Sequence, residues 1–437
     1  MALLAPTRSR VVPQPSAGIW PGLFDPPHAA VHSAIARRLV HAAVASLPLT
    51  LRFPDGSRWG SGGPSLQVIR PGAFFSRLGT DGLIGFGEAW MTGEITTGGW
   101  PATGPDAVDP RQANLATDEL AEVLTVLAHR VNVLVPRSLQ KLRRMWQARQ
   151  PEIEDNTPDG ARENIHRHYD LSNDLFEVFL DPTMTYSAAW YEPGDDLPSA
   201  QLRKIDGVLD LARVQPGQHI LEIGSGWGAL AIRAARERGA KVTTLTLSEQ
   251  QRALAMKRIA AAGLSDRIEV RLEDYRVHAA AHPGEYDAVV SVEMIEAVGE
   301  KYWPDYFAAV DRVLGPGGRM GLQAITLSHQ RLLATRNSYT WVHKYVFPGG
   351  QLPSLTAIDQ VLSSATSLQV VESRRLGLSY VPTLAAWRHR FNENLDRVAD
   401  LGFDQTFVRM WNFYLAYSQA GFAARYLDDW QLGLARP

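Results

Sequence analysis

The chain has 437 residues, 45% of them hydrophobic, so it can bury a large core and should form two or three domains. Its formal net charge of −2 gives no general attraction to nucleic acid, and we predict no nucleic-acid partner. The absence of cysteine excludes disulfides and thiolate nucleophiles, no apolar run approaches the ~18 residues of a transmembrane helix, and no metal site is predicted.

The N-terminal part of the chain predicts a tail followed by a small domain. Residues 1–20 contain only a brief apolar run before proline and arginine interrupt it, which indicates a flexible tail rather than a signal peptide. Short strand-like runs at 49–59 and 65–75 alternate with turn residues, and 82–95 mixes glycine with aromatic residues. We therefore predict an accessory α/β domain over residues 21–150.

Two helical stretches end this predicted domain. The first begins with Thr117 as a helix N-cap and repeats apolar residues at 120, 123, 124, 127 and 131, the spacing of one helical face. The second, residues 136–150, carries five basic residues and no acid beside an apolar side. It predicts either a helix that lies on anionic lipid or an ordinary packed helix with a solvated basic face.

Residues 149–160 combine acidic residues, proline and glycine, so we place the domain boundary there. Beyond it, apolar runs of four to six residues alternate with helical stretches. This rhythm predicts an α/β fold with a parallel sheet covered on both faces, in which ligands bind at the carboxyl ends of the strands.

A glycine turn follows the first of these strands, in the stretch HILEIGSGWGALAIRAA (219–235). Gly224, Gly226 and Ala229 satisfy the spacing of dinucleotide binders, so a dehydrogenase stays open. Glu222 favours a different ligand, because a carboxylate before the turn can meet the amino group of S-adenosylmethionine. It can equally bond the N–H groups of the loop. An acid expected for an NAD ribose is missing at the end of the next strand, although Glu249 lies just beyond it.

An ordered series of motifs runs from about residue 160 to the C-terminus: HYDLSNDLF (168–176), MTYSAAWY (184–191), LEIGSGWG, TLSEQQ, EDY, KYVFPGG and YVPTLAAW. Through them the chain resembles the cyclopropane-fatty-acyl-phospholipid synthase family of S-adenosylmethionine-dependent enzymes. GLIGFGEAWMTGE, VEMIEAVG, QAIT and FPGGQLPS carry a closer likeness to the actinobacterial unsaturated-fatty-acid methyltransferases, which make 10-methylene and ultimately 10-methyl stearoyl chains. The resemblance implies a Rossmann-like class I methyltransferase sheet over 151–437 and an N-terminal domain that helps to present phospholipid.

The resemblance also assigns the cofactor site. Tyr186 and Ser187 would lie against the methionine part of S-adenosylmethionine, and Asp274 near its adenine. The remaining implied residues form the turn and the ribose side: Glu222, Gly224, Gly226, Gly228, Thr246, Leu247 and Gln251.

Methylation of an isolated alkene creates a carbocation, so the pocket must be dry, and aromatic faces can help to stabilise the charge. Aromatic residues near the motifs, of which we expect one or two to face the acyl chain, are Tyr169, Trp190, Trp303, Tyr345, Phe347 and Trp387.

A base must remove a proton from this cation. In the family, bicarbonate does this, held by a cysteine, a glutamate, a histidine, a main-chain isoleucine and a tyrosine. Here Glu296, Ile325 and Tyr380 match three positions, whereas Ala188 replaces the cysteine and Gln323 the histidine. Bicarbonate could still bind, because the Gln323 amide can donate to an anion.

A protein base is the alternative to bicarbonate. Ala297 replaces a histidine common after the family glutamate, and Glu293 adds a carboxylate beside Glu296, where like-charge repulsion would raise one pKa. Glu293 could otherwise face solvent or cap a helix. The implied catalytic residues are thus Glu296, Tyr380, Gln323 and Glu293.

The implied reaction is transfer of a one-carbon unit to the double bond of an oleoyl-type phospholipid, giving the 10-methylene chain. Cyclopropane formation on the same substrate is the alternative, and a lipid carrier without activity stays open. The resemblance further implies a separate reductase that saturates the product, a cytoplasmic enzyme peripherally bound to the inner face of the membrane, and either a monomer or a homodimer.

Overall fold

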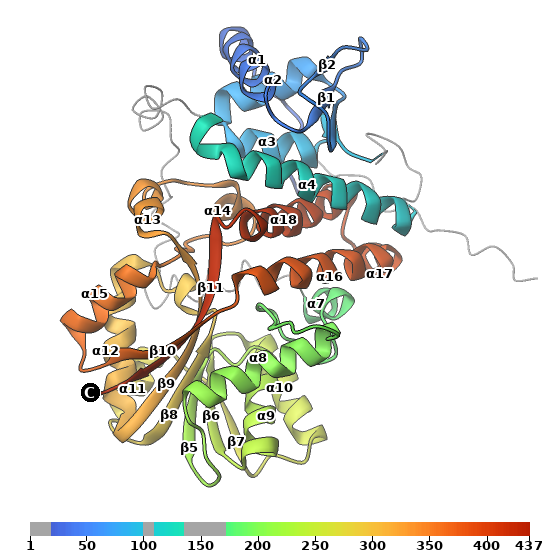
Figure 1. The fold of residues 1–437 in the computed structure, drawn as a ribbon. Helices are drawn as coiled ribbons and strands as arrows, with labels where there is room; N and C mark the ends of the chain where they lie inside the picture. The colour runs from blue at the N-terminus through green and yellow to red at the C-terminus, as the bar shows by residue number, and fades with distance from the viewer. Residues whose placement is uncertain (1–18, 99–108, 135–171) are drawn as a thin grey trace, which may run out of the picture. The chain divides into compact units, whose positions relative to one another are not determined.

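The computed structural model describes residues 19–98, 109–134 and 172–437 (Figure 1). The predicted basic helix, the predicted boundary and most of the predicted tail lie outside these ranges. The chain divides into two compact units, one of residues 1–146 with 384–424 and the other of residues 147–383 with 425–437. The division differs from the predicted domains, because a C-terminal helical segment groups with the N-terminal part of the chain.

The first unit combines a small sheet with helices. Its four strands have the order β2-β1-β3-β4, in which β1 and β3 are parallel and the other pairs antiparallel. The strands are β1 (Thr50–Arg52), β2 (Arg58–Trp59), β3 (Ser65–Val68) and β4 (Ile95–Thr96). The helices are α1 (Ala30–Val44), α2 (Pro71–Asp81), α3 (Leu83–Met91), α4 (Pro110–Leu134), α17 (Leu395–Asp400) and α18 (Gln405–Ala423).

Helix α18 explains why residues 384–424 belong to this unit. Most of its side chains are buried, and it packs against α3 and α4. Phe413 contacts Phe86 with ring centroids 6.2 Å apart. The buried Arg409 donates to the main-chain oxygens of Trp90 and Ile95 and lies over the Trp90 ring. A hydrophobic helix of this kind requires a partner, and the N-terminal helices supply it.

The expected amphipathic helix is α4, but its start is wrong. It begins at Pro110, and Thr117 lies inside it with a fully buried side chain whose hydroxyl donates to the Ala113 oxygen at 2.9 Å. Threonine in a helix interior can satisfy its hydroxyl in this way, so the N-cap signal was misleading. The apolar face is confirmed where side chains are described, since Leu120 and Val123 are buried.

Buried charge also holds the first unit together. Arg77 on α2 forms ion pairs with Glu94 (2.9 Å) and Glu88 (3.3 Å), and all three side chains are almost fully buried. Loss of one of these charges would leave its partners buried and uncompensated, which would destabilise the folded unit.

The second unit contains a seven-stranded sheet of order β10-β11-β9-β8-β5-β6-β7. The prediction of an α/β fold is confirmed, but the sheet is not wholly parallel, since β11 is antiparallel to both β9 and β10. The strands are β5 (His219–Ile223), β6 (Lys241–Thr246), β7 (Ile268–Leu272), β8 (Tyr286–Val292), β9 (Leu314–Leu327), β10 (Gln369–Arg375) and β11 (Leu427–Ala435).

Helices cover both faces of this sheet (Figure 1). Ile220 of β5 packs in a core with α8, α9 and α10, whereas its neighbour Leu221 packs in the opposite core with α12 and α15, as the two-residue period of a strand requires. The main helices are α7 (Asn173–Phe179), α8 (Leu197–Leu211), α9 (Ala229–Arg238), α10 (Glu249–Ala261), α11 (Tyr275–Ala281), α12 (Trp303–Val313) and α15 (Leu355–Ala365). Shorter helices are α13 (His329–Thr335) and α14 (Trp341–Tyr345), with 3₁₀ turns η2 (Ile295–Ala297), η3 (Glu300–Tyr302) and η4 (Gly377–Ser379).

Helix α16 (Tyr380–Glu393) contains the division between the two units.

Across the described ranges, none of the helices has both the length and the apolar content needed to cross a bilayer.

Candidate active site

The parallel strands bring most of the predicted cofactor residues to one edge of the sheet. The ends of β5, β6 and β7 lie in register, with Ile223 opposite Leu245 and Thr246 opposite Leu272. The residues that follow these strands therefore meet at the carboxyl edge, where α/β sheets bind ligands.

The glycine turn connects β5 to α9 at this edge. Gly224, Gly226 and Gly228 all have positive φ angles, of 99°, 47° and 86°. The N–H groups of Gly224 and Ser225 both donate to the Leu245 oxygen, at 3.0 and 2.9 Å, which fixes the turn to β6. Glycine is required here because other residues rarely adopt three such conformations so close together.

Glu222 lies just before the turn and is buried. Its Oε2 accepts a hydrogen bond of 2.6 Å from the Thr244 hydroxyl, which also lies 2.7 Å from the Ser225 hydroxyl. Burial raises the Glu222 pKa to about 8, against the effects of the Thr244 hydrogen bond and of the Lys204 charge. A cationic ligand at this edge would favour the ionised carboxylate.

The residues predicted for the ribose side also come together. Thr246 Oγ1 lies 2.9 Å from Gln251 Oε1 and accepts from the Ser248 N–H at 3.1 Å. Ser248 caps α10 by accepting from the Gln251 N–H. Leu247 is partly exposed between them. The start of α10 thus holds Thr246 and Gln251 in one fixed arrangement.

Asp274 occupies the end of β7 as the N-cap of α11. Both of its carboxylate oxygens accept from the Arg276 guanidinium, at 2.8 and 2.7 Å. Arg276 also lies over the rings of Tyr275 and Tyr302. Asp274 is therefore a buried, ion-paired residue at the predicted adenine side.

The segment between α7 and α8 holds the last predicted cofactor residues. Tyr186 packs its ring edge-on against Phe176, with centroids 5.1 Å apart, and stays partly exposed. The Ser187 hydroxyl is buried and accepts a 2.6 Å hydrogen bond from Lys204 Nζ. Met184, three residues before Ser187, has a φ of 57°, an uncommon conformation for a side chain of this size.

Lys204 is a site residue that the sequence prediction missed. It is almost fully buried on α8, where burial lowers its pKa to about 8 against the attraction of Glu293 and Asp429. The signal was available, because Lys204 lies one helical turn from both Ala200 and Val208, which are buried, and so shares their face.

Glu293 follows β8 and is held by three donors. Its Oε1 accepts from the Ala188 N–H (2.8 Å) and from Gln323 Nε2 (2.9 Å), and its Oε2 accepts from the Tyr380 hydroxyl (2.7 Å). The pKa of Glu293 is raised by burial, and these bonds oppose the shift. With a φ of 49°, its backbone occupies the left-handed region that favours glycine. The alternative that Glu293 faces solvent is wrong.

Glu296 lies three residues later in η2. Its Oε1 accepts from the Ile325 N–H at 2.5 Å, whereas its Oε2 is buried and has no hydrogen-bond partner among the described residues. Burial and, to a smaller extent, the nearby Glu293 charge together raise the Glu296 pKa to about 8. The Glu296 main-chain oxygen accepts from the Gln351 N–H at 2.7 Å, so the KYVFPGG loop also supports this residue.

Gln323 connects this pair to the interior of the sheet. Its amide nitrogen lies 3.0 Å from Asp429 Oδ2, and its oxygen accepts from Gln431 at 3.1 Å. Asp429 is a second residue that the prediction missed. It lies on β11 opposite Ile325, is fully buried, and has a pKa raised well above its usual range by burial and by the charges of Glu293 and Glu296.

These contacts do not fit bicarbonate. The donors expected to hold that anion are the Gln323 amide, the Ile325 N–H and the Tyr380 hydroxyl, and each already donates to a glutamate of the chain. A further anion would also lie beside two buried carboxyl groups, which disfavours its charge.

The predicted aromatic residues separate into different environments. Trp303 is buried in the sheet core and donates to the Ile295 oxygen, and Trp387 is buried in the first unit. Trp190 lies beneath the Arg374 guanidinium at 4.1 Å. Tyr345 and Phe347 are partly exposed around the KYVFPGG loop, and Tyr169 lies outside the described residues.

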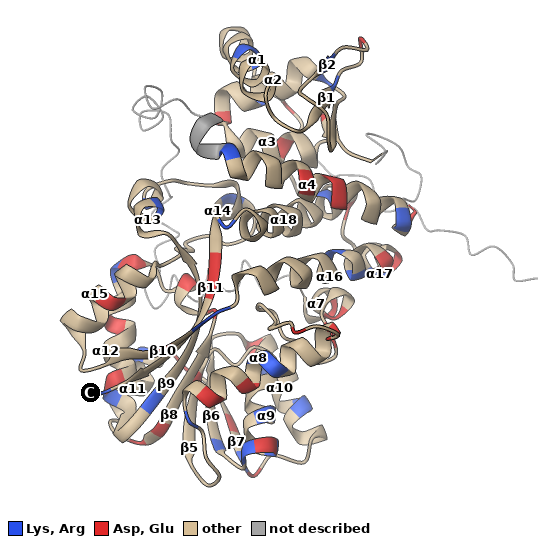
Figure 2. Ribbon diagram, viewed as in Figure 1, with Lys and Arg blue, Asp and Glu red and all other residues tan. Residues whose placement is uncertain are grey.

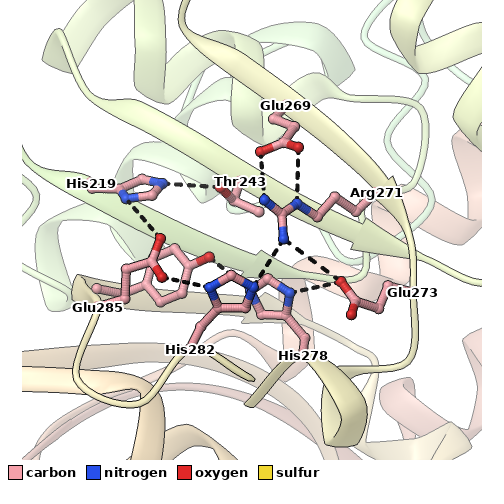
Figure 3. Close-up of polar contacts among 9 residues, drawn as sticks. His219, Thr243, Glu269, Arg271, Glu273, His278, His282 and Glu285 are labelled. Carbon is pink, nitrogen blue, oxygen red and sulfur yellow. Dashed lines mark hydrogen bonds and ion pairs between the residues drawn. The ribbon is translucent and has the colours of Figure 1, made fainter. Parts of the chain in front are cut away.

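A second polar cluster in this unit contains three histidines (Figure 3). His278 contacts Glu273 and Tyr286 at 2.8 and 2.7 Å, and His282 contacts Glu285 and Arg271 at 2.5 and 3.1 Å. His219 lies 3.0 Å from Thr243 and 3.9 Å from Glu285. Every ring nitrogen has a partner, so this cluster connects strands to α11 and offers no free ligand position.

Comparison with known proteins adds independent information. Residues 156–432 match the family described as mycolic acid cyclopropane synthetase. The chain is 48% identical to tuberculostearic acid methyltransferase UfaA1 of Mycobacterium tuberculosis, over 97% of each chain. It is 32% identical to cyclopropane-fatty-acyl-phospholipid synthase of Escherichia coli, over 86% of this chain and 89% of that protein.

Solved structures agree with this result. The cyclopropane synthase MmaA2 of Mycobacterium tuberculosis aligns with a TM-score of 0.58 and 31% identity, covering 63% of this chain and 98% of that one. The mycolic acid cyclopropane synthase CmaA1, complexed with SAH and CTAB, aligns with a TM-score of 0.56 and 28% identity over 65% of this chain and 98% of that one. The predicted class I methyltransferase fold is thereby confirmed.

Proposed function

The chain belongs to the mycolic acid cyclopropane synthetase family and is an S-adenosylmethionine-dependent enzyme acting on fatty acids, and from this premise we propose that it adds a one-carbon unit to the double bond of an oleoyl-type phospholipid chain. The product is the 10-methylene stearoyl chain. Support for an unsaturated-chain substrate comes from the 48% identity to a protein named for tuberculostearic acid.

The cofactor supplies an electrophilic methyl group when bound. The edge that carries the glycine turn suits it, because Glu222 is a buried carboxyl that a cationic amino group would compensate, and Thr246 and Gln251 offer polar atoms to a ribose. Tyr186 and Ser187 directly precede Ala188, whose N–H donates to Glu293. The segment that carries them therefore lies beside the carboxyl pair. This links the cofactor segment to the proposed base.

The observation that carries the proposal is the difference between Glu293 and Glu296. Glu293 accepts hydrogen bonds from three donors, whereas Glu296 keeps one buried oxygen without a partner in the described ranges. An oxygen that must receive a proton needs an unoccupied lone pair. We therefore assign the base to Glu296 Oε2, whose pKa is kept high by burial and by the nearby Glu293 charge.

The reaction then follows from the chemistry of the acyl chain. The alkene electron pair would form the new bond to the methyl group as the methyl–sulfur bond breaks, with S-adenosylhomocysteine as the leaving group and a cation left on the neighbouring chain carbon. A hydride shift moves the cation to the carbon that bears the new methyl group. Glu296 Oε2 takes a proton from that methyl group, and the C–H electron pair forms the exocyclic double bond. A dry pocket would protect the cation until this step.

Cyclopropane formation differs only in omitting the hydride shift, so the same base would serve it. We favour the methylene product because of the likeness to the tuberculostearic acid methyltransferase. A methylene-bearing chain becomes a 10-methyl chain by addition of two hydrogens, which requires a separate reductase. Because the substrate is a phospholipid chain, the enzyme must also reach a membrane surface.

The experiment that tests the proposal uses the full-length protein, S-adenosylmethionine and vesicles of dioleoyl phospholipid in buffer freed of bicarbonate. We expect lipid that has gained one carbon and shows the olefinic proton signals of an exocyclic methylene group. Cyclopropane proton signals in place of these would contradict the methylene product and identify the cyclopropane chain as the product. Lipid that gains no carbon would contradict the proposed substrate. Lipid that gains carbon only after bicarbonate is restored would contradict the proposed protein base.

A further inference from the structure

Helix α1 of the first unit exposes apolar side chains along one face. Val31, Ile35 and Leu39 lie one helical turn apart and are 71%, 51% and 42% exposed. Ala34 and Ala42 lie on the same face and are also exposed. The face turned to the protein is smaller, since Ala36 and Val44 are the fully buried residues of the helix. The more apolar face of α1 is therefore the one that points outward.

The charges of α1 are all of one sign. Arg37 and Arg38 lie in the middle of the helix, and no acidic residue occurs between residues 30 and 44 (Figure 2). Arg37 lies 5.7 Å over the Trp59 ring, which is partly exposed beside the helix. Arg38 forms no ion pair with any residue in the described ranges. Aromatic and arginine side chains of this kind suit the boundary between lipid tails and headgroups.

We propose that the outward face of α1 (Val31, Ala34, Ile35, Leu39 and Ala42, with Arg38 among them) docks on an anionic phospholipid bilayer. The apolar side chains enter the surface while Arg38 contacts lipid phosphates, and Arg37 lies on another side of the helix, over Trp59. This inference rests on the proposed function, which requires a lipid substrate, and it assigns the contact with the bilayer to one helix.

A second copy of the chain is a poorer occupant of this face. In a two-fold dimer the same face meets itself, and the centre of an antiparallel helix pair meets the centre of its copy. Here Arg38 lies at that centre, so two like charges would face each other. An anionic lipid surface has the opposite charge and needs no acid on the protein.

The test measures cosedimentation of the full-length protein with vesicles of equal parts phosphatidylglycerol and phosphatidylcholine. The variant V31S/I35S/L39S removes the apolar side chains, and we expect its vesicle affinity to fall at least about tenfold. The control M256S/V277S/L333S removes equally exposed apolar residues of the second unit and should bind as wild type does. The variant R38Q should weaken binding to the anionic vesicles and flatten its salt dependence.

Wild-type protein that fails to bind the vesicles, or a triple variant that binds as tightly as wild type, would overturn the proposal. A wild-type dimer that becomes monomeric in the triple variant, with vesicle binding unchanged, would instead assign the face to self-association. If the triple variant does not fold, the single variant I35E gives the same comparison.

Methyl transfer to oleoyl phospholipid in detergent micelles separates this proposal from the proposed function. The triple variant should keep the wild-type rate in micelles and lose it on vesicles. Wild-type protein that binds vesicles but transfers no carbon in either system would contradict the proposed function and leave the docking face standing.

Discussion

The Tyr380 hydroxyl donates a 2.7 Å hydrogen bond to Glu293 Oε2, while the Ala188 N–H and Gln323 donate to the other oxygen of the same carboxylate. Glu293 is thus held from both sides. The carboxylate of its partner Glu296 accepts one hydrogen bond from the residues that the structure describes, that of the Ile325 N–H. Two glutamates three positions apart in the sequence therefore have different capacities to receive a proton.

Replacing Glu296 with glutamine should reduce product formation at least about a hundredfold, because the amide cannot take up a proton. The affinity for S-adenosylmethionine should stay within a few fold of wild type, since Glu222 and the glycine turn are unchanged. Turnover of labelled lipid and calorimetry measure the two quantities. The exposed Glu237→Gln is the matched control, and a Glu296→Gln enzyme with wild-type turnover would remove this residue from the mechanism.

Replacing Tyr380 with phenylalanine should slow turnover by about tenfold, a smaller effect than the loss of Glu296. The variant loses one hydrogen bond to Glu293, and Ala188 and Gln323 still hold that carboxylate. Single-turnover kinetics with saturating cofactor measure the change. A rate equal to that of wild type would mean that Tyr380 only packs.

The rate should rise with pH up to about 8, because the base acts in its ionised form and burial raises the Glu296 pKa to about 8. The titration belongs to the Glu293 and Glu296 pair, since each charge acts on the other. Glu293→Gln removes the like charge and should move the midpoint of the kcat/KM profile to lower pH. A midpoint that does not move would contradict the role assigned to Glu293.

Replacing Glu222 with glutamine should raise the Kd for S-adenosylmethionine by about ten- to a hundredfold, because a charged hydrogen bond to the ligand's amino group is lost. S-adenosylhomocysteine carries the same amino group, so its Kd should rise in parallel. Calorimetry with both ligands measures this. A variant that binds both as wild type does would restrict Glu222 to supporting the loop through Thr244.

Replacing Arg77 with methionine should lower the free energy of unfolding by about 3–5 kcal/mol, because Glu88 and Glu94 would remain buried without their cation. Urea unfolding of the full chain measures the change. The exposed Arg52→Met should alter stability by no more than about 0.5 kcal/mol. Equal effects of the two variants would show that the buried ion pairs contribute nothing specific.

Much of the catalytic sheet could be predicted from the sequence because its parallel strands are short apolar runs with a clear period. The glycine turn was equally visible, since Gly224, Gly226 and Gly228 mark backbone conformations that other residues avoid. Local sequence patterns therefore identified the edge of the sheet where the cofactor residues meet.

What the sequence did not reveal depends on contacts between distant segments. Asp429 reaches the carboxyl pair only because β11 inserts beside β9, and Gln323 becomes a connector for the same reason. Thr117 has the sequence pattern of an N-cap, but α4 begins before it, at Pro110. The hydrogen bonds that give Glu293 and Glu296 different environments likewise come from residues far apart in the chain.

The position of β11 has a consequence for how this protein is made. The strand between β9 and β10 consists of residues 427–435, and α18 of the first unit precedes it directly in the sequence. Neither unit can be finished while the ribosome still holds these residues. We expect nascent chains to keep an open sheet edge and an uncovered α3 and α4 until residues 405–435 have left the ribosome.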